Sequence, residues 1–186
     1  MVIGITGTDG SGKGTVVDYL VENKGFTHYS ARTFLVAEIE KRGLPMSRNQ
    51  MRLMANEFRA KYGSGFLVTR ASALMHEEGV DCAVIESIRS LGEAEEIKKL
   101  NGILLAVDAD LELRFERVQA RRSESDQVDF ETFVKQEELE KNDPDPNGMQ
   151  KAAVMEMADY TITNNGTVGE LYQQVEKFLK QVDAKN

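Results

Sequence analysis

Gly7-Thr8-Asp9-Gly10-Ser11-Gly12-Lys13-Gly14-Thr15 is the stretch that decides the fold, and it follows the apolar run Val2-Ile3-Gly4-Ile5. An apolar strand, a glycine-rich turn and a helix in this order are the context of a phosphate-binding loop. Glycines let consecutive backbone N–H groups point inward around an anion, because no Cβ blocks the tight curve. The following helix adds the positive end of its dipole, and Lys13 adds a charge for the β- and γ-phosphates of a nucleotide. We therefore expect this phosphate loop (residues 7–15) to bind a nucleotide through Gly7, Asp9, Gly10, Ser11, Gly12, Lys13, Gly14 and Thr15.

The phosphate loop departs at one position from the general pattern G-x-x-x-x-G-K-[ST], which places a hydroxyl residue directly after the lysine. Gly14 stands there, and Thr15 comes next. The hydroxyl at that place usually ligates Mg²⁺, so its absence favours an ion held mainly by nucleotide phosphates and water. We expect Thr15 to contact a phosphate or a water molecule of that ion.

Composition bounds the class of protein. A chain of 186 residues with 41% hydrophobic and 29% charged residues is typical of one globular domain. A net charge of −8 argues against a nucleic-acid polymer as partner, although a mononucleotide needs only a local basic cleft. The lone Cys82 lies in an apolar run and is expected to be a buried hydrophobe. With no internal disulfide, no signal peptide and no membrane span expected, the sequence favours the cytoplasm.

Short apolar runs alternate with helical patterns along the chain, which predicts an α/β fold with a five-stranded parallel sheet and helices on both faces. The middle third, residues 31–78, shows no clear strand and is interpreted as a helical insertion between the second and third strands. The predicted strands are Val2–Thr6, Phe26–Tyr29, Cys82–Glu86, Gly102–Val107 and Tyr160–Thr163.

The third predicted strand ends in Glu86, and Arg89 follows three residues later. Ligands of parallel sheets bind outside the carboxyl ends of the strands, so both side chains are expected near the phosphate loop. Glu86 is then placed to order water molecules of Mg²⁺, and the Arg89 guanidinium can bind two oxygens of an acceptor phosphate. A surface salt bridge at a strand end is the alternative interpretation.

Arginines gather at two further places. Arg114, Arg117 and Arg121 share one helix face, and Arg122 precedes a short polar segment. This pattern is typical of a short lid, here residues 117–130, whose arginines stabilise a transferring phosphoryl group, although a solvated helix face is the alternative. In the insertion, Arg48, Arg52 and Arg59 fall close to one helix face, where they line an acceptor pocket or simply face solvent.

These parts together resemble the P-loop kinase group that contains adenylate kinase and its nucleoside-monophosphate-kinase relatives. The Gly12-Lys13-Gly14-Thr15 ending and the Glu86–Arg89 segment carry the likeness. The chain is similar to small archaeal-type nucleotide kinases in Arg89-Ser90-Leu91, in Phe115-Glu116-Arg117 and in residues 158–164. The resemblance implies a P-loop kinase fold with an acceptor-binding insertion and a lid, and it places Asn165 and Gly166 beside the ATP adenine. Dephospho-CoA kinase is a neighbour, through residues 55–63.

The resemblance also has departures. Adenylate kinases carry an arginine early in the first inserted helix that binds the acceptor phosphate, whereas this chain has Val36 there and Arg32 one turn earlier. The long adenylate kinase lid is absent. Both departures argue against AMP as the acceptor without weakening phosphoryl transfer.

Asp9 places a carboxylate inside a loop that binds anions, which requires a reason. Thymidylate kinases carry an acid at the matching place, which contacts the acceptor sugar. Alternatively, the Asp9 side chain caps the turn through its own backbone. The sequence leaves both interpretations open.

The sequence thus predicts a Mg·ATP-dependent kinase acting on a small phosphorylated acceptor, above all a nucleoside monophosphate. Lys13 binds phosphate, Glu86 organises the metal through water, Arg89 holds the acceptor with Arg32 and Arg59, and Arg117, Arg121 and Arg122 stabilise the transition state. The alternatives are a dephospho-CoA kinase and a non-catalytic ATP-binding regulatory module.

Overall fold

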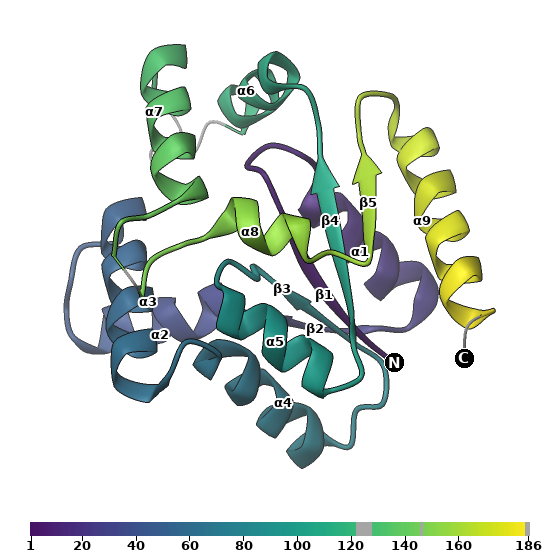
Figure 1. The fold of residues 1–186 in the computed structure, drawn as a ribbon, viewed down its shortest axis with the longest axis horizontal. Coiled ribbons are helices and arrows are strands. Elements are labelled where there is room, and N and C mark those ends of the chain that lie inside the picture. Colours follow the sequence, from purple (N-terminus) through teal and green to yellow (C-terminus); the bar gives the residue numbers. More distant parts are fainter. Residues whose placement is uncertain (122–127, 146, 185–186) are drawn as a thin grey trace.

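A computed structural model describes residues 1–121, 128–145 and 147–184 of the chain. Its centre is a five-stranded sheet in which every pairing is parallel, with the strand order β2-β3-β1-β4-β5 (Figure 1). Each strand lies within one residue of its predicted bounds at either end, and the α/β parallel fold is confirmed. The strands are β1 (Val2–Gly7), β2 (Thr27–Ser30), β3 (Ala83–Glu86), β4 (Ile103–Asp108) and β5 (Tyr160–Thr163).

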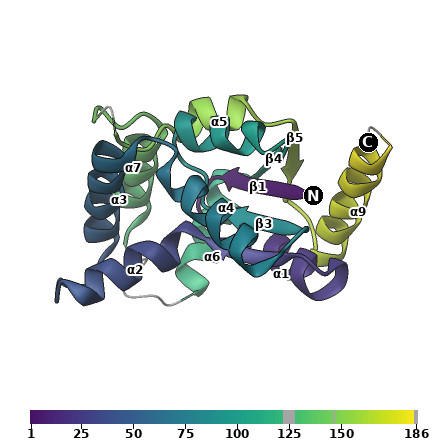
Figure 2. The ribbon, with the colours of Figure 1, turned by 90° about the horizontal axis from the view of Figure 1, so that it is seen from below.

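Helices cover both faces of the sheet, as strands that are apolar on both sides require. On one face, α1 (Lys13–Lys24) and α9 (Val168–Asp183) bury Leu20 and Phe178 against β1 and β4. On the other face, α4 (Phe66–Glu78), α5 (Leu91–Lys99) and α8 (Lys151–Glu156) bury Ile97 and Val154. Figure 2 shows β1 and β3 between α5 and α1.

The region between β2 and β3 is helical and has a small core of its own. It contains α2 (Ala31–Lys41), α3 (Arg48–Tyr62) and α4. Leu35, Ile39, Met54, Phe58 and Leu67 are buried together there. This separate core keeps the insertion (residues 31–78) ordered beside the sheet.

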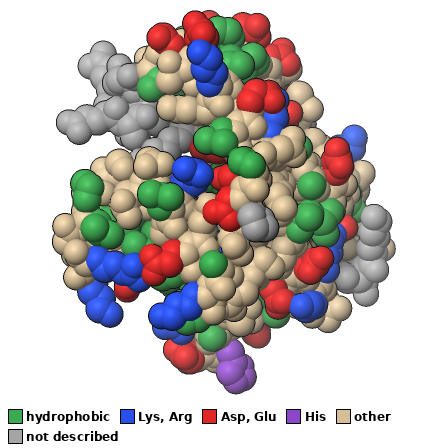
Figure 3. Space-filling model, turned by 60° about the vertical axis from the view of Figure 1, so that its left-hand side comes forward, with side chains coloured by type: hydrophobic (Ala, Val, Ile, Leu, Met, Phe, Trp, Pro, Cys, Tyr) green, Lys and Arg blue, Asp and Glu red, His purple; other side chains and the backbone are tan. Residues whose placement is uncertain are grey.

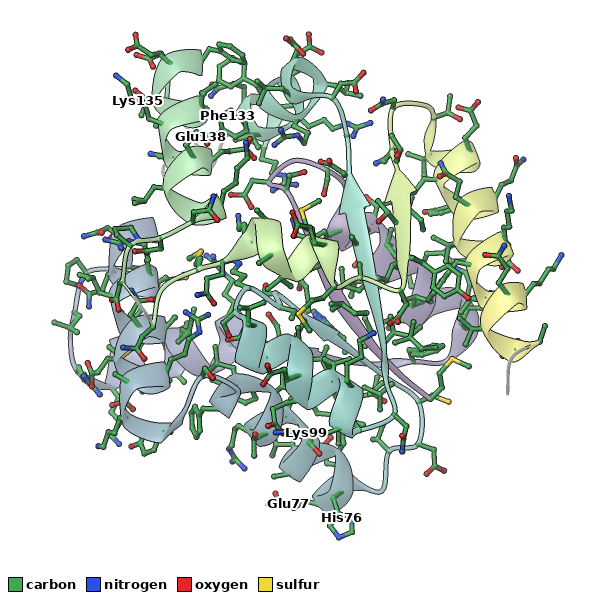
Figure 4. All side chains as sticks on the ribbon, in the orientation of Figure 1. His76, Glu77, Lys99, Phe133, Lys135 and Glu138 are labelled. Atoms are coloured by element: carbon green, nitrogen blue, oxygen red, sulfur yellow. The ribbon has the colours of Figure 1, made fainter. Side chains whose placement is uncertain are left out.

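Two further helices stand beyond the carboxyl ends of the strands, α6 (Leu111–Ala120) and α7 (Phe130–Lys141) (Figure 1). They pack through the ring of Phe115, which lies 5.2 Å from the ring of Phe130 and 5.6 Å from that of Phe133, measured between centroids. Figure 4 shows Phe133 on the side of α7 that faces α6. Residues 122–127 of the predicted lid lie outside the described residues.

Charge and hydropathy give two further observations. Among the helices that the structure describes, none combines the length and the apolar content needed to cross a bilayer. On the face drawn in Figure 3, basic and acidic side chains are interspersed instead of forming one basic field.

Candidate active site

The phosphate loop runs from the end of β1 to the start of α1, and its glycines are required by their surroundings. Gly10 has φ +80°, and a Cβ there would lie 2.4 Å from the carbonyl oxygen of Arg114. Gly12 has φ +97°, and a Cβ there would lie 2.3 Å from Nδ2 of Asn164. At Gly10 the obstacle is backbone and excludes a side chain, whereas at Gly12 the positive φ and the Asn164 amide together disfavour one. The loop is wedged against α6 and the end of β5, which fixes its curve.

Hydroxyl groups hold the outer part of the loop. The Ser11 hydroxyl donates to the carbonyl of Thr8 at 2.8 Å, and the Thr8 hydroxyl donates to Oδ1 of Asp108 at 2.5 Å. No atom within 4 Å would meet a Cβ on Gly14, so the space at the start of α1 is open. Thr15 is half-buried beside it, and its hydroxyl makes no hydrogen bond with the part of the chain that the structure describes.

Lys13 folds back over the loop. Its Nζ donates to the carbonyl oxygens of Gly7 at 3.2 Å and Thr8 at 2.6 Å. Removal from water lowers the pKa of Lys13 to about 8, while the nearby carboxylate of Asp9 acts in the opposite direction. Lys151 and Arg89 contribute to this lowering and Glu86 opposes it, so three cationic side chains converge on this point. A bound anionic ligand would offset the repulsion between these positive charges.

Glu86 lies at the end of β3, where the register aligns it with Ile5 of β1 and Ser30 of β2. Its Oε2 is 3.1 Å from Nε2 of His28 on β2. This hydrogen bond is the main cause that lowers the pKa of Glu86, and Lys13 and Arg89 add to it. The carboxylate is therefore held in its charged form.

The turn after Glu86 has a constrained backbone. Ser87 has φ +71°, an uncommon conformation for a residue other than glycine. The hydroxyl of Thr6 donates to the carbonyl of Ile88 at 2.8 Å and holds the turn on β1. Strain of this kind persists only where the surroundings enforce it, and it often marks a functional site.

Arg89 is half-buried, and its guanidinium makes no hydrogen bond or ion pair with the residues that the structure describes. It is close enough to Lys13 and Glu86 to influence the pKa of both. The structure thus brings together Lys13, Asp9, Glu86 and Arg89. They were predicted from two segments more than 70 residues apart in the sequence.

The structure gives Arg59 a buried ionic partner, and its predicted contact with an acceptor stays a prediction. Its side chain is 1% exposed, and Nη2 lies 2.9 Å from Oε1 of the fully buried Glu93. The other oxygen of Glu93 accepts from the backbone N–H groups of Arg89 at 2.7 Å and Ser90 at 3.1 Å. Arg59 therefore supports the Arg89 turn through Glu93, because its charge is already neutralised inside the protein.

The remaining predicted residues lie at different distances from this cluster. Arg117 donates to the carbonyl of Asn164 at 2.9 Å, and the Asn164 side chain donates to the carbonyl of Ser11 at 2.8 Å. Asn165 accepts from the backbone of Asp110 at 2.8 Å, which joins the β5–α9 loop to the start of α6. These contacts bring Arg117 and the β5–α9 loop, with its exposed Gly166, to the phosphate loop.

Other predicted arginines are not drawn into the cluster. Arg32 is exposed just after β2, and Arg121 is exposed at the end of α6. Arg122 lies outside the described residues, as does the side chain of Arg48. Arg52 forms an ion pair at 3.1 Å with Asp143, so it holds the segment after α7 on the insertion.

Sequence reasoning missed two residues of the cluster. His28 belongs to no motif in the sequence, although the parallel register of β2 and β3 places it beside Glu86. Lys151 was not considered, yet its Nζ lies 3.3 Å from Oδ1 of Asp9. This partner of Asp9 belongs to neither of the two interpretations of that carboxylate. No local pattern could have revealed a contact across 142 residues.

Comparison with known proteins places this geometry in a family. Residues 3–145 match a family model described as an AAA domain. The chain belongs to this AAA-domain family. A UPF0200 protein of Methanococcus maripaludis is 29% identical to this AAA-domain chain over 184 residues, which are 97% of either protein.

Solved structures share the fold. The crystal structure of TT1252 from Thermus thermophilus matches this AAA-domain protein with a TM-score of 0.62 and 25% identity, covering 100% of this chain and 97% of the other. A shikimate kinase from Acinetobacter baumannii matches with a TM-score of 0.57 and 22% identity, covering 100% and 94%. The protein therefore has a P-loop kinase-like nucleotide-binding fold.

Proposed function

We propose that the protein is a Mg·ATP-dependent kinase that transfers a phosphoryl group to a small phosphorylated acceptor, and among these we favour a nucleoside monophosphate. The observation that carries the proposal is the half-buried Arg89 guanidinium, which has no protein partner among the described residues and lies within electrostatic reach of Lys13. A guanidinium kept without a carboxylate is suited to bind a phosphate with two hydrogen bonds. Two cationic groups at one point match a reaction that brings two phosphates together.

Each residue of the cluster then has a defined task. Lys13 exchanges the carbonyl oxygens of Gly7 and Thr8 for phosphate oxygens, which keeps it protonated. Arg89 orients the acceptor phosphate towards the phosphate loop. Arg117 lies beside Asn164, where it can approach the nucleotide from α6. Catalysis of this kind consists of positioning and charge stabilisation, with little covalent work for the protein.

A Mg²⁺ ion fits the residues present. No group of three or more His, Cys, Asp or Glu side chains among the described residues could hold a metal alone. The Thr15 hydroxyl and the charged Glu86 carboxylate are therefore the residues that would hold the ion, together with the phosphates and water. When bound, such an ion would neutralise the charge that develops on the phosphate oxygens.

A coupled assay of ADP production tests the proposal, with a panel of nucleoside monophosphates and dephospho-CoA as acceptors. Lys13→Met serves as the inactive control, because removing its charge should cost on the order of 10²-fold or more in kcat. ADP release that depends on one acceptor class supports a kinase and identifies its substrate. ATP binding without acceptor-dependent turnover contradicts the proposal and supports a regulatory module.

A further inference from the structure

Asp9 is an acid within a loop that binds anions, and its charge must be offset before a nucleotide can bind. Its side chain is 17% exposed, and its carboxylate is close enough to Lys13 to raise the pKa of that group. The charge is therefore directed at the place where the phosphates would lie. In a partly buried site, solvent screens the repulsion between this charge and a phosphate only weakly.

Lys151 supplies an opposite charge from a distant part of the chain. Its side chain is 5% exposed, and its Nζ lies 3.3 Å from Oδ1 of Asp9. The same ammonium also binds the carboxylate of Glu140 on α7. It stands in the wall of a cavity of about 240 Å³, with Thr8, Asp108 and Glu137. Lys151 thus links the phosphate loop, α7 and α8.

The position of Lys151 is fixed by its neighbours in the chain. The backbone N–H of Gln150 donates to the carbonyl of Arg89 at 2.8 Å. This hydrogen bond anchors the residue before Lys151 on the Arg89 turn. Arg114 connects the same two parts of the molecule as Lys151. It binds Glu137, one turn of α7 before Glu140, and it donates to the carbonyl oxygen of Asp9 at 3.3 Å. The side of the loop at Asp9 is therefore held by charged groups on α6, α7 and α8.

We propose that Lys151 is a positioning residue that neutralises Asp9 and thereby allows the phosphate loop to bind nucleotide phosphates. The inference rests on the proposed function in one respect, namely that the phosphate loop binds a nucleotide. Lys151 acts through Asp9 and does not contact the phosphates itself. Its removal should therefore weaken binding only while the Asp9 carboxylate is present.

A double-mutant cycle tests this dependence. Because loss of Lys151 would also leave Glu140 unpaired and could prevent folding, the cycle is made in a Glu140→Gln background. Asp9→Asn, Lys151→Met and the combination are compared with that background by calorimetric titration with the non-hydrolysable Mg·AMPPNP at pH 7.5. Circular dichroism and thermal unfolding confirm that each variant is folded. Lys141→Met is the matched control, because Lys141 lines the same cavity and pairs with Glu138 instead of Asp9.

Lys151→Met should weaken the affinity for Mg·AMPPNP about tenfold, equivalent to about 1.4 kcal/mol. Asp9→Asn in the same chain should restore it to within about threefold of the background, and Lys141→Met should leave it unchanged. Equal weakening with and without the Asp9 carboxylate would overturn the inference, because Lys151 would then contact the phosphates directly. An unchanged affinity of the Lys151→Met variant would overturn it as well. Failure of the unmodified protein to bind Mg·AMPPNP would instead refute the proposed function, and the inference with it.

Discussion

At the scale of one residue, the pKa of Lys13 depends on whether the site holds an anion. Burial lowers its pKa from the ordinary 10.5 to about 8, and its only acceptors among the described residues are backbone carbonyl oxygens. A bound phosphate would raise that pKa again, because an anion favours the charged form. The same shift makes the unliganded protein more stable as the pH rises from about 8 to 10.5, since the unfolded chain then binds more protons than the folded one.

The affinity for Mg·ADP should therefore be constant below pH 8 and fall as the pH rises from about 8 to 10. Above pH 8 the free protein loses the proton of Lys13 and must regain it on binding, so the decrease approaches tenfold for each pH unit. Titration calorimetry across this range measures the change. Lys13→Arg is the matched control, because arginine stays charged throughout and its affinity should not vary. A wild-type affinity that is constant up to pH 10 would contradict the lowered pKa.

Arg89 allows a second prediction at the scale of one residue. Arg89→Lys keeps the positive charge and removes the planar donor pair, so the KM for the acceptor should rise about tenfold or more while the KM for ATP changes little. Steady-state kinetics with the acceptor identified in the coupled assay separate the two constants. A defect confined to the KM for ATP would move Arg89 to the donor side of the reaction.

At the scale of elements, polar contacts join the insertion to the turn that carries Arg89. Arg59 of α3 binds Glu93 of α5, and Glu93 holds the backbone N–H groups of Arg89 and Ser90. Asn56, also on α3, donates to Asp145 at 2.8 Å in the segment that leads to Lys151. The insertion therefore has a positioning role, because α3 holds the Arg89 turn through Glu93 and the segment before Lys151 through Asp145.

Breaking the Arg59–Glu93 pair should be costly because its partner would remain charged inside the protein. Arg59→Met is expected to lower the free energy of unfolding by about 3–5 kcal/mol. Arg42→Met is the control from the same region, since Arg42 pairs with Glu38 and Glu57 at the surface, where solvent screens the charges, and its loss should cost far less than that of Arg59. Urea unfolding followed by circular dichroism compares the two. Similar losses for both variants would show that the buried pair contributes no more than a surface pair.

At the scale of the whole molecule, the sequence predicted the sheet and the phosphate loop because both rest on local patterns. Apolar runs and glycine spacing determine β1 and residues 7–15, whatever the rest of the chain does. The ion pair of Arg59 with Glu93 and the contact of Lys151 with Asp9 were not predicted, because the partners are 34 and 142 residues apart in the sequence. A charged side chain on a helix looks the same in sequence whether it meets solvent, a ligand or a buried carboxylate. Only the packing of α3, α5, α7 and α8 distinguishes these cases.

The stability of the whole molecule can separate a kinase from a regulatory module, because a kinase of the proposed kind binds two ligands at once. Mg·ADP at 100 times its dissociation constant should stabilise the fold by about 2.7 kcal/mol, which corresponds to about 5–10 °C in Tm. If Arg89 belongs to a separate acceptor site, a saturating nucleoside monophosphate should raise Tm further in the presence of Mg·ADP. The Arg89→Lys variant should keep the first increase and lose most of the second, whereas Lys13→Met should lose most of the first. Calorimetric unfolding with each ligand alone and with both measures these increments. If no monophosphate or dephospho-CoA produces a second increment, the chain holds a single nucleotide, which is the behaviour of a sensor and not of a kinase with this acceptor class.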